Sequence, residues 1–180
     1  VRSHNAGPSG TLRFNAFASA ARSALMPLVM EFLQHHLKIH IDVVTEGRLV
    51  DIVADCFDFG VRSESLVPND MIMIPLGPPQ RYAVVGSQAY FEKHGKPRTP
   101  SELLQHRCIR VRLPNEGIFP WYFERDAEVT RLDVSGPLTL DEPSLVKVAV
   151  QEGMGLGFFM EQDVHHEIRA GQFVRVLEEW

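Results

Sequence analysis

The sequence predicts an α/β fold in two lobes, from three observations. Stretches with the period-2 hydrophobicity of a strand alternate with stretches that have the period of a helix, which is typical of mainly parallel sheets covered by helices. A proline-rich break at residues 75–79, PLGPP, interrupts this alternation and marks a boundary between lobes. The chain has 180 residues, 44% of them hydrophobic, which is enough to pack a core without disulfides.

The stretch that organises the chain is residues 12–33, where a strand pattern changes into a helix pattern. Apolar residues alternate over 12–16, and from Leu25 they recur every three or four positions on one helix face. Small residues lie between the two patterns, including Ser19, where a helix leaves its first N–H groups unpaired. An ordinary helix cap explains this junction, and so does an anion site at the carboxyl end of a strand.

Two more strands and a short helix complete the first half of the chain. In order, we expect a strand at 39–43, a short helix at 49–56 that ends near Cys56, a strand at 57–61 and an apolar run at 71–74. Thr45 follows the first of these strands, and Arg62 and Ser63 follow the second.

The second half repeats the alternation. Strands are expected at 82–85, 108–111, 129–134, 138–140, 155–159 and 173–176, and helices at 89–93, 100–104, 145–151 and 162–169. Thr99-Pro100-Ser101-Glu102 is a capping box with Pro at the first helical position. Asp141-Glu142-Pro143-Ser144 likewise opens a helix, which Gly153 ends.

Composition excludes several classes of protein. The formal net charge of −5 gives no overall attraction to nucleic acid. Only Cys56 and Cys108 are present, which suits a reducing cytoplasm, although two thiols leave a single bridge open. The sequence has no apolar run near the roughly 20 residues that span a bilayer, and its first residues are not those of a signal peptide. We expect a cytoplasmic domain with no membrane partner.

The sequence also lacks the known motifs of catalytic, metal-binding and nucleotide-binding sites. There is no P-loop, G-x-S-x-G elbow or H-E-x-x-H sequence, and the eight histidines lack metal-ligand spacing. Gly153-x-Gly155-x-Gly157 follows a helix and opens a strand, whereas a dinucleotide loop does the reverse. We therefore expect no catalytic residue, no metal site and no cofactor.

Many short motifs occur in a fixed order along the chain. They are Gly10-x-Leu12-Arg13-Phe14, Pro27-x-x-x-x-Phe32, Asp55-x-Phe57-Asp58-Phe59-Gly60-Val61-Arg62, Pro75-Leu76-Gly77, Ala89-Tyr90, His94-Gly95-x-Pro97-x-Thr99-Pro100-x-x-Leu103, His106-x-Cys108, Trp121-x-Phe123, Gly136-x-Leu138, the Gly153 series and Phe173-Val174-x-Val176-Leu177-x-x-Trp180. In this order the chain resembles the effector-binding domain of a LysR-type transcriptional regulator, from about Gly10 to Trp180.

The resemblance implies two Rossmann-like lobes joined by two crossing strands, similar to type 2 periplasmic binding proteins. Residues 1–10 would be a linker or tail. Residues 11–79 plus 159–180 would form lobe one, and residues 80–158 would form lobe two.

The resemblance also implies a ligand site in the cleft between the lobes. Carried onto this sequence, the cleft positions are Ser19, Thr45, Arg62, Ser63, Gly86, Asp141, Glu142 and Phe158. The start of the helix that follows Ser19 would attract an acidic group of the ligand. Asp141 and Glu142 would accept hydrogen bonds from a hydroxyl or amine at the other end of the ligand.

One residue departs from the family's pattern. Cys56 stands where the family usually has glycine, and if the backbone there needs a positive φ, the side chain costs about 1 kcal/mol. A redox role would need a lowered thiol pKa, which the neighbouring Asp55 and Asp58 oppose.

The function implied is that of a metabolite-sensing domain without chemistry of its own. A winged helix-turn-helix domain absent from this chain would bind DNA, and the sensing domains would pair as homodimers within a tetramer, through the first helix with Met26 and Met30. A solute-binding component of a transporter, with the same two lobes, is the alternative. A small transferase or hydrolase is a third class, for which we find no paired nucleophile and base.

Overall fold

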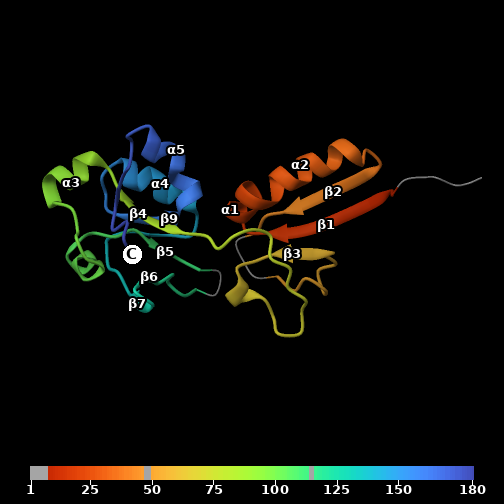
Figure 1. Cartoon of the computed structure of the whole chain (residues 1–180), viewed down its shortest axis with the longest axis horizontal. Coiled ribbons are helices and arrows are strands. Elements are labelled where there is room, and N and C mark those ends of the chain that lie inside the picture. The colour runs from red at the N-terminus through yellow and green to blue at the C-terminus, as the bar shows by residue number, and fades with distance from the viewer. Residues whose placement is uncertain (1–7, 47–49, 114–115) are drawn as a thin grey trace, which may run out of the picture. The chain divides into compact units, whose positions relative to one another are not determined.

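The computed structural model describes residues 8–46, 50–113 and 116–180. The chain divides into two compact units, Val1–Pro78 and Pro79–Trp180, and each is described by itself (Figure 1). Most of the predicted tail at residues 1–10 and Leu49 of the predicted short helix lie outside the described residues. Among the described helices, none is long and apolar enough to cross a membrane.

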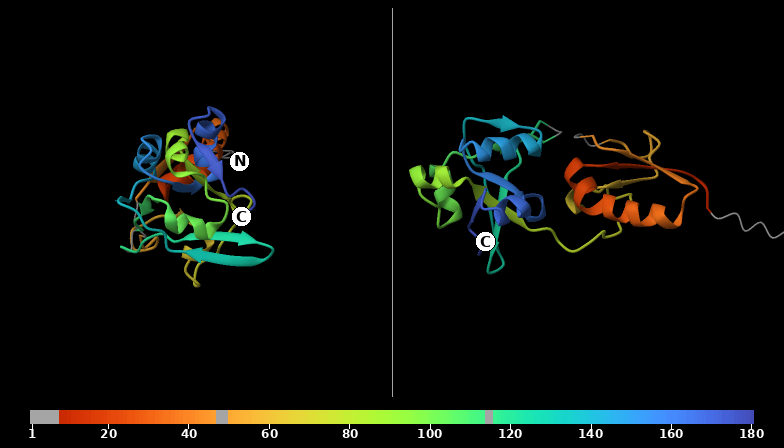
Figure 2. Two further views of the ribbon diagram at one scale, coloured as in Figure 1. Left: turned by 90° about the vertical axis from the view of Figure 1, so that its left-hand side faces the viewer. Right: turned by 90° about the horizontal axis from the view of Figure 1, so that it is seen from above.

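The first unit is a three-stranded parallel sheet with one long helical stretch on it (Figures 1 and 2). Its strands are β1 (Gly10–Ala16), β2 (Ile39–Val44) and β3 (Phe59–Val61), in the order β2-β1-β3, all parallel. The helical stretch comprises α1 (Ala18–Ala20), the π-type turn η1 (Ala21–Leu25) and α2 (Met26–His35). Its inner face packs on the sheet through Ala21, Leu25 and Val29. The expected apolar face is confirmed at Leu25, Val29 and Leu33, whereas Leu28 and Phe32 of the same predicted face are 47% and 37% exposed.

The helix begins earlier than its apolar pattern indicates. Its N-cap is Phe17, so the prediction of a helix start after Ser19 is wrong, and Ser19 lies inside the first turn. Pro27 has no N–H to give to the helical ladder, and the widened turn η1 lies directly before it. A regular 3.6-residue pattern cannot extend through such a turn.

One other prediction for the first unit is wrong. Residues 52–56 form turns rather than a helix, because the Asp51 carboxylate accepts hydrogen bonds from the backbone N–H groups of Val53 and Ala54, at 3.0 and 2.9 Å. The apolar run at 71–74 follows the 3-10 helix η2 (Glu64–Leu66) as irregular chain, with Ile72 94% exposed.

The second unit is built on an antiparallel sheet rather than the parallel one predicted. Strands β4 (Tyr82–Gly86), β9 (Gly157–Met160) and β10 (Val174–Val176) lie in the order β10-β4-β9. Helices α4 (Pro143–Gln151) and α5 (Glu161–Arg169) pack on this sheet through Val146, Val150 and Val164. Residues 159–180, which the sequence analysis assigns to lobe one, lie here in the second unit because β9 and β10 pair with β4.

A short parallel pair and a hairpin extend the second unit. Strands β5 (Arg110–Val111) and β8 (Thr139–Leu140) are parallel, whereas β6 (Trp121–Arg125) and β7 (Glu128–Leu132) form an antiparallel hairpin, which Figure 2 shows as a two-stranded ribbon. The sequence analysis missed β6. The hairpin turns at Asp126 and Ala127, with φ of 52° and 64°, and Ala is not a residue that signals such a turn.

Helices α3 (Gln88–His94) and η3 (Pro100–Gln105) form where they were predicted. Ser87 caps α3 by accepting a hydrogen bond from the N–H of Tyr90, and Gly95 ends it at a φ of 75°. The capping-box helix is a 3-10 helix, in which Glu102 instead accepts a hydrogen bond from the N–H of Arg98 at 2.9 Å.

The glycine series at residues 153–157 has a packing role. A Cβ built on Gly155 would lie 2.5 Å from the carbonyl oxygen of Arg107, which is too close for any side chain. The N–H of Leu156 donates to that same carbonyl at 2.8 Å, and the N–H of Ile109 donates to Leu156. Glycine at 155 therefore lets two backbone segments pair directly.

A hydrogen-bonded chain joins α3 to the end of η3. The Tyr90 hydroxyl accepts from the N–H of Arg107 at 3.0 Å and lies within hydrogen-bond distance of Nδ1 of His106, 3.1 Å away. Burial, and then the charge of His94, lower the pKa of His106, and Glu102 opposes the shift. The folded chain therefore favours the neutral form of His106.

We predict that His106 makes stability fall with acid. Because its pKa is lower in the folded chain than its ordinary value of about 6.5, the unfolded state binds the proton first. Urea midpoints should fall as the pH drops from about 7.5 through 6.5 and level off below the folded pKa. The His106→Gln variant should lose part of this difference, and the exposed control His165→Gln should keep it. An unchanged difference in His106→Gln would contradict the assignment.

Cys56 is the second source of a stability prediction. Its φ is 57°, so the position does need the left-handed conformation that favours glycine. We expect Cys56→Gly to raise the free energy of unfolding by about 1 kcal/mol in urea. Cys56→Ala is the matched control, since it removes the thiol and keeps Cβ, and an equal gain from Cys56→Ala would show that the thiol and not the backbone is responsible.

Candidate functional site

The carboxyl ends of the first unit's three strands meet at one edge of its sheet. Asn15 of β1 lies opposite Val44 of β2 and opposite Gly60 of β3. Because the strands are parallel and in this register, the residues that follow them emerge together. Those residues are Ser19 after β1, Thr45 after β2, and Arg62 with Ser63 after β3, so four of the predicted site positions share this edge.

Arg62 is held at this edge by hydrogen bonds to neutral oxygens. Its Nη1 donates to the carbonyl of Asn15 at 3.4 Å and to that of Val61 at 3.2 Å, and its Nη2 donates to Oδ1 of Asn15. The Phe17 ring lies against the guanidinium, 5.4 Å from ring centroid to Cζ.

In the described part of the first unit, no acidic side chain serves as a counter-ion for Arg62. Among the described residues, no carboxylate forms an ion pair with it. Burial lowers the pKa of Arg62 from its ordinary value, which reflects the cost of withdrawing the cation from water. An anion at this edge would compensate that cost.

The start of the adjoining helix adds donors beside Arg62. The first hydrogen bond of the helix runs from the N–H of Ala21 to the carbonyl of Phe17 at 2.8 Å, which leaves the N–H groups of residues 18–20 outside the helical ladder. Phe17 carries no capping group, and no side chain caps this start. The half-buried Ser19 hydroxyl lies in the same turn.

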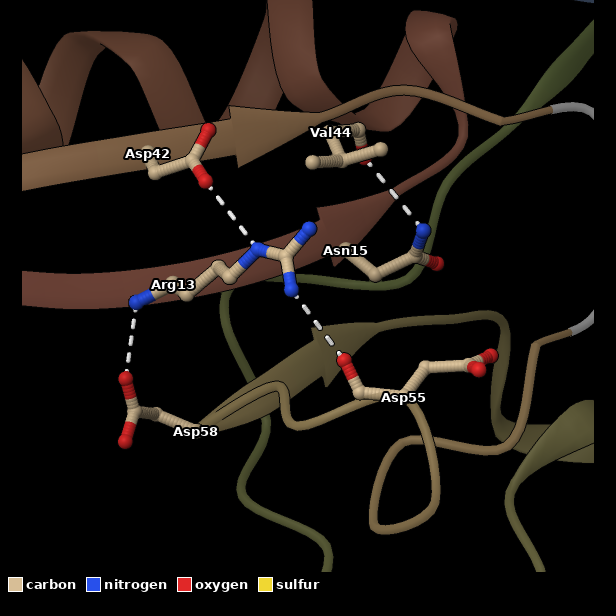
Figure 3. Close-up of polar contacts among 6 residues, drawn as sticks. All are labelled: Arg13, Asn15, Asp42, Val44, Asp55 and Asp58. Atoms are coloured by element: carbon tan, nitrogen blue, oxygen red, sulfur yellow. Dashed lines mark hydrogen bonds and ion pairs between the residues drawn. The ribbon is translucent and has the colours of Figure 1, made fainter.

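Sequence reasoning missed Asn15, the residue on which the Arg62 geometry depends. It reads as an ordinary alternating position in β1, yet it is fully buried, beside Phe14 and Ala16. A polar amide inside a strand that is otherwise apolar at its carboxyl end is the signal that could have found it. Its Nδ2 donates to the carbonyl of Val44 at 3.4 Å (Figure 3).

A second polar network, next to Asn15 on β1, ties the same strands together (Figure 3). Arg13 pairs through Nε with Asp42 of β2 at 3.0 Å and donates from Nη1 to the carbonyl of Asp55 at 3.2 Å. Its backbone N–H donates to Oδ2 of Asp58 at 2.7 Å. The charge of Arg13 is thus neutralised by Asp42, and its contacts stabilise the sheet. Arg62, by contrast, is held by neutral oxygens.

Two predicted positions of the second unit lie in its core. Phe158 of β9 is 7% exposed and stacks on Tyr82 and Trp121, with ring centroids 4.8 and 5.0 Å apart. A Cβ on Gly86, at the end of β4, would lie 2.7 Å from Leu156. Both residues are therefore fixed by packing within the second unit.

Asp141 and Glu142 lie between β8 and α4, where they were predicted. Glu142 is the N-cap of α4, and its carboxylate accepts hydrogen bonds from the N–H groups of Ser144 and Leu145 at 2.9 and 3.2 Å. Asp141 is exposed. Glu142 thus occupies the start of its own helix and repels a second anion there.

The second unit also contains an open cavity of about 460 Å³, beneath hairpin β6–β7. Its walls combine the aromatic rings of Tyr82, Phe158 and Trp180 with charged side chains. Arg125 pairs there with Glu179 at 3.6 Å. In the described part of the chain, no group of three or more histidine, cysteine or acidic residues is arranged to hold a metal ion.

Comparison with known proteins identifies the family. The model of the LysR substrate binding domain matches residues 5–180. The chain is 37% identical over 173 residues to the uncharacterized HTH-type transcriptional regulator YcaN of Escherichia coli and 37% identical over 175 residues to a putative transcriptional regulator of Pseudomonas aeruginosa. Each alignment covers 96% of this chain, but 56% and 57% of the relative.

Solved structures agree on the fold. CrgA, a LysR-type regulator of Neisseria meningitidis, superposes with a TM-score of 0.78 at 22% identity, over 96% of this chain and 57% of that one. The virulence activator AphB of Vibrio cholerae superposes with a TM-score of 0.80 at 22% identity, over 97% of this chain and 58% of that one. The chain belongs to the LysR substrate-binding-domain family, and it spans a little over half the length of these relatives.

This assignment confirms the family and the fold class expected from the ordered motifs. The fold is the α/β fold of type 2 periplasmic binding proteins. The relatives named above are transcriptional regulators rather than solute-binding components of transporters.

The Glu142 cap gives a prediction for the second unit. Replacing Glu142 by Ala removes the acceptor for two N–H groups of α4 and should lower the free energy of unfolding by about 1 kcal/mol in urea. Asp141→Ala, next to it and exposed, is the control and should change stability far less. Equal losses in the two variants would show that general charge, not capping, matters at this helix start.

Proposed function

We propose that this chain is the effector-sensing domain of a transcriptional regulator and binds a small anionic metabolite at the carboxyl edge of its first sheet. The observation that carries the proposal is Arg62, a partly buried cation held by neutral oxygens and without an acidic partner among the described residues. Ser19 and Thr45 supply hydroxyls at the same edge. Together they form a set of donors suited to one negatively charged group.

In the second unit, Asp141 and Glu142 are proposed as candidate ligand contacts. Asp141 is an exposed carboxylate directly after β8, and it suits a hydroxyl or amine donor. The Glu142 carboxylate accepts hydrogen bonds from N–H groups of α4, so it disfavours an acidic group at that helix start.

In the whole protein, binding of the metabolite would control transcription through a DNA-binding part outside this chain. The formal net charge of −5 supports a sensing role rather than a DNA-contacting role for these residues. No chemical turnover of the ligand and no cofactor are part of the proposal.

Pairing of two sensing domains through the first helix also belongs to the proposal. Leu28, Met30 and Phe32 of α2 are 47%, 55% and 37% exposed, which gives this helix an apolar outer face. Met26, which the sequence analysis placed on the same surface, packs instead against the core of the first unit.

Calorimetric titration tests the proposed anion site, with the metabolite that raises the melting temperature most in a screen. Arg62→Ala should weaken binding about ten- to hundredfold, the range for a hydrogen bond to a charged group. Ser19→Ala should weaken it about two- to tenfold. Arg22→Ala, an exposed arginine of the same unit, is the matched control and should bind as the parent does.

Two outcomes would count against the site. If Arg62→Ala and Ser19→Ala bind the metabolite as tightly as the parent, the anion lies elsewhere. If Arg22→Ala weakens binding as much as Arg62→Ala, the affinity for the metabolite depends on the net charge of the unit and not on a site at Arg62.

A further inference from the structure

We infer that Asn15 is the positioning residue that aims the Arg62 guanidinium so that its remaining N–H groups can bind an anion. This inference rests on the proposed function, since it concerns the same edge of the first sheet. It assigns a role to a residue that lies inside β1 rather than among the residues that follow the strands.

Asn15 connects all three strands through one buried amide. Its Nδ2 donates to the carbonyl of Val44 at the end of β2, and its Oδ1 accepts from Nη2 of Arg62, directly after β3. These two bonds fix which way the amide faces, because a flipped amide would turn its NH₂ group toward the guanidinium. A fully buried side chain with both ends bonded holds its partner in one orientation.

The hydrogen bonds to Asn15 and Val61 leave a defined set of donors on Arg62. A guanidinium has five N–H bonds, and three are used, two from Nη1 and one from Nη2. The two that remain are on Nε and Nη2, on neighbouring nitrogens. A carboxylate or a phosphate can accept hydrogen bonds from two neighbouring guanidinium nitrogens at once, so either anion suits these donors.

The choice of an amide at position 15 also preserves the charge that the ligand needs. An aspartate there would accept the same hydrogen bond but would neutralise Arg62 from inside the protein. A leucine would leave the Val44 carbonyl and the guanidinium without their partner. Among these side chains, only the neutral amide holds the guanidinium and leaves its charge to an outside anion.

The test uses NMR of the arginine Nε–H resonances in the whole chain, titrated with sodium acetate and, separately, with sodium sulfate. Comparison with Arg62→Ala assigns the Arg62 resonance. In the parent, this resonance should shift with acetate and with sulfate in a concentration-dependent way that reaches saturation. In Asn15→Asp, the acetate response should weaken at least tenfold while the protein stays folded.

Two further variants control for the effect of added charge and for the shape of the cation. Asn69→Asp adds the same charge to an exposed position of the first unit and should leave the acetate response unchanged. Arg62→Lys keeps the positive charge but has no planar fork of donors for Asn15 to hold, so acetate binding, followed by backbone amide shifts, should weaken several-fold. This variant tests the positioning even if Asn15→Asp fails to fold.

The outcomes separate the inference from the proposed function. If the Arg62 resonance of the parent responds to neither anion, the anion site itself is wrong. If the parent responds and Asn15→Asp responds equally, Asn15 does not position Arg62. If Arg62→Lys binds acetate as tightly as the parent, the oriented guanidinium is not what binds the anion.

Discussion

Parallel pairing of β1 with β2 on one side and β3 on the other brings three separate stretches of chain to one edge of the first sheet. In a parallel sheet, every connection returns to the same side, so the residues after the strands accumulate there without any contact of their own. The helix that starts at Ala18, Thr45 directly after β2 and Arg62 directly after β3 are neighbours for this reason. A change that shifted the register of β1 would separate them all.

The cation at this edge is stabilised without being neutralised. Burial disfavours the charge of Arg62. The hydrogen bonds that its guanidinium donates to neutral oxygens, together with the Phe17 ring, replace part of the lost hydration. Arg13 shows the alternative within the same sheet, because the Asp42 carboxylate pairs with it at 3.0 Å. One arginine thus braces the sheet and the other is left able to bind an anion, and the difference lies in the partners that each strand supplies.

The sequence carried enough information for the elements whose ends have local signals. Ser87, Glu142 and the glycines that end α3, α4 and α5 act within a turn of their own helix, so their roles can be predicted from neighbouring residues. The hairpin β6–β7 was missed because its turn uses Asp126 and Ala127 at positive φ, where glycine is the expected signal. The antiparallel order β10-β4-β9 was missed because pairing between distant strands leaves no local pattern.

The candidate site follows the same division between local and distant effects. Arg62 and Ser19 could be named from the sequence because each follows an apolar strand. The role of Asn15 could not, because it depends on Val44, 29 residues away, and on Arg62, 47 residues away. The starts of the first helix and of α4 differ in how they are capped. At the first helix no side chain caps the start, whereas α4 is capped by its own carboxylate. Of the two helix starts, the first is therefore the one that can receive an anion from outside, and the second already holds one.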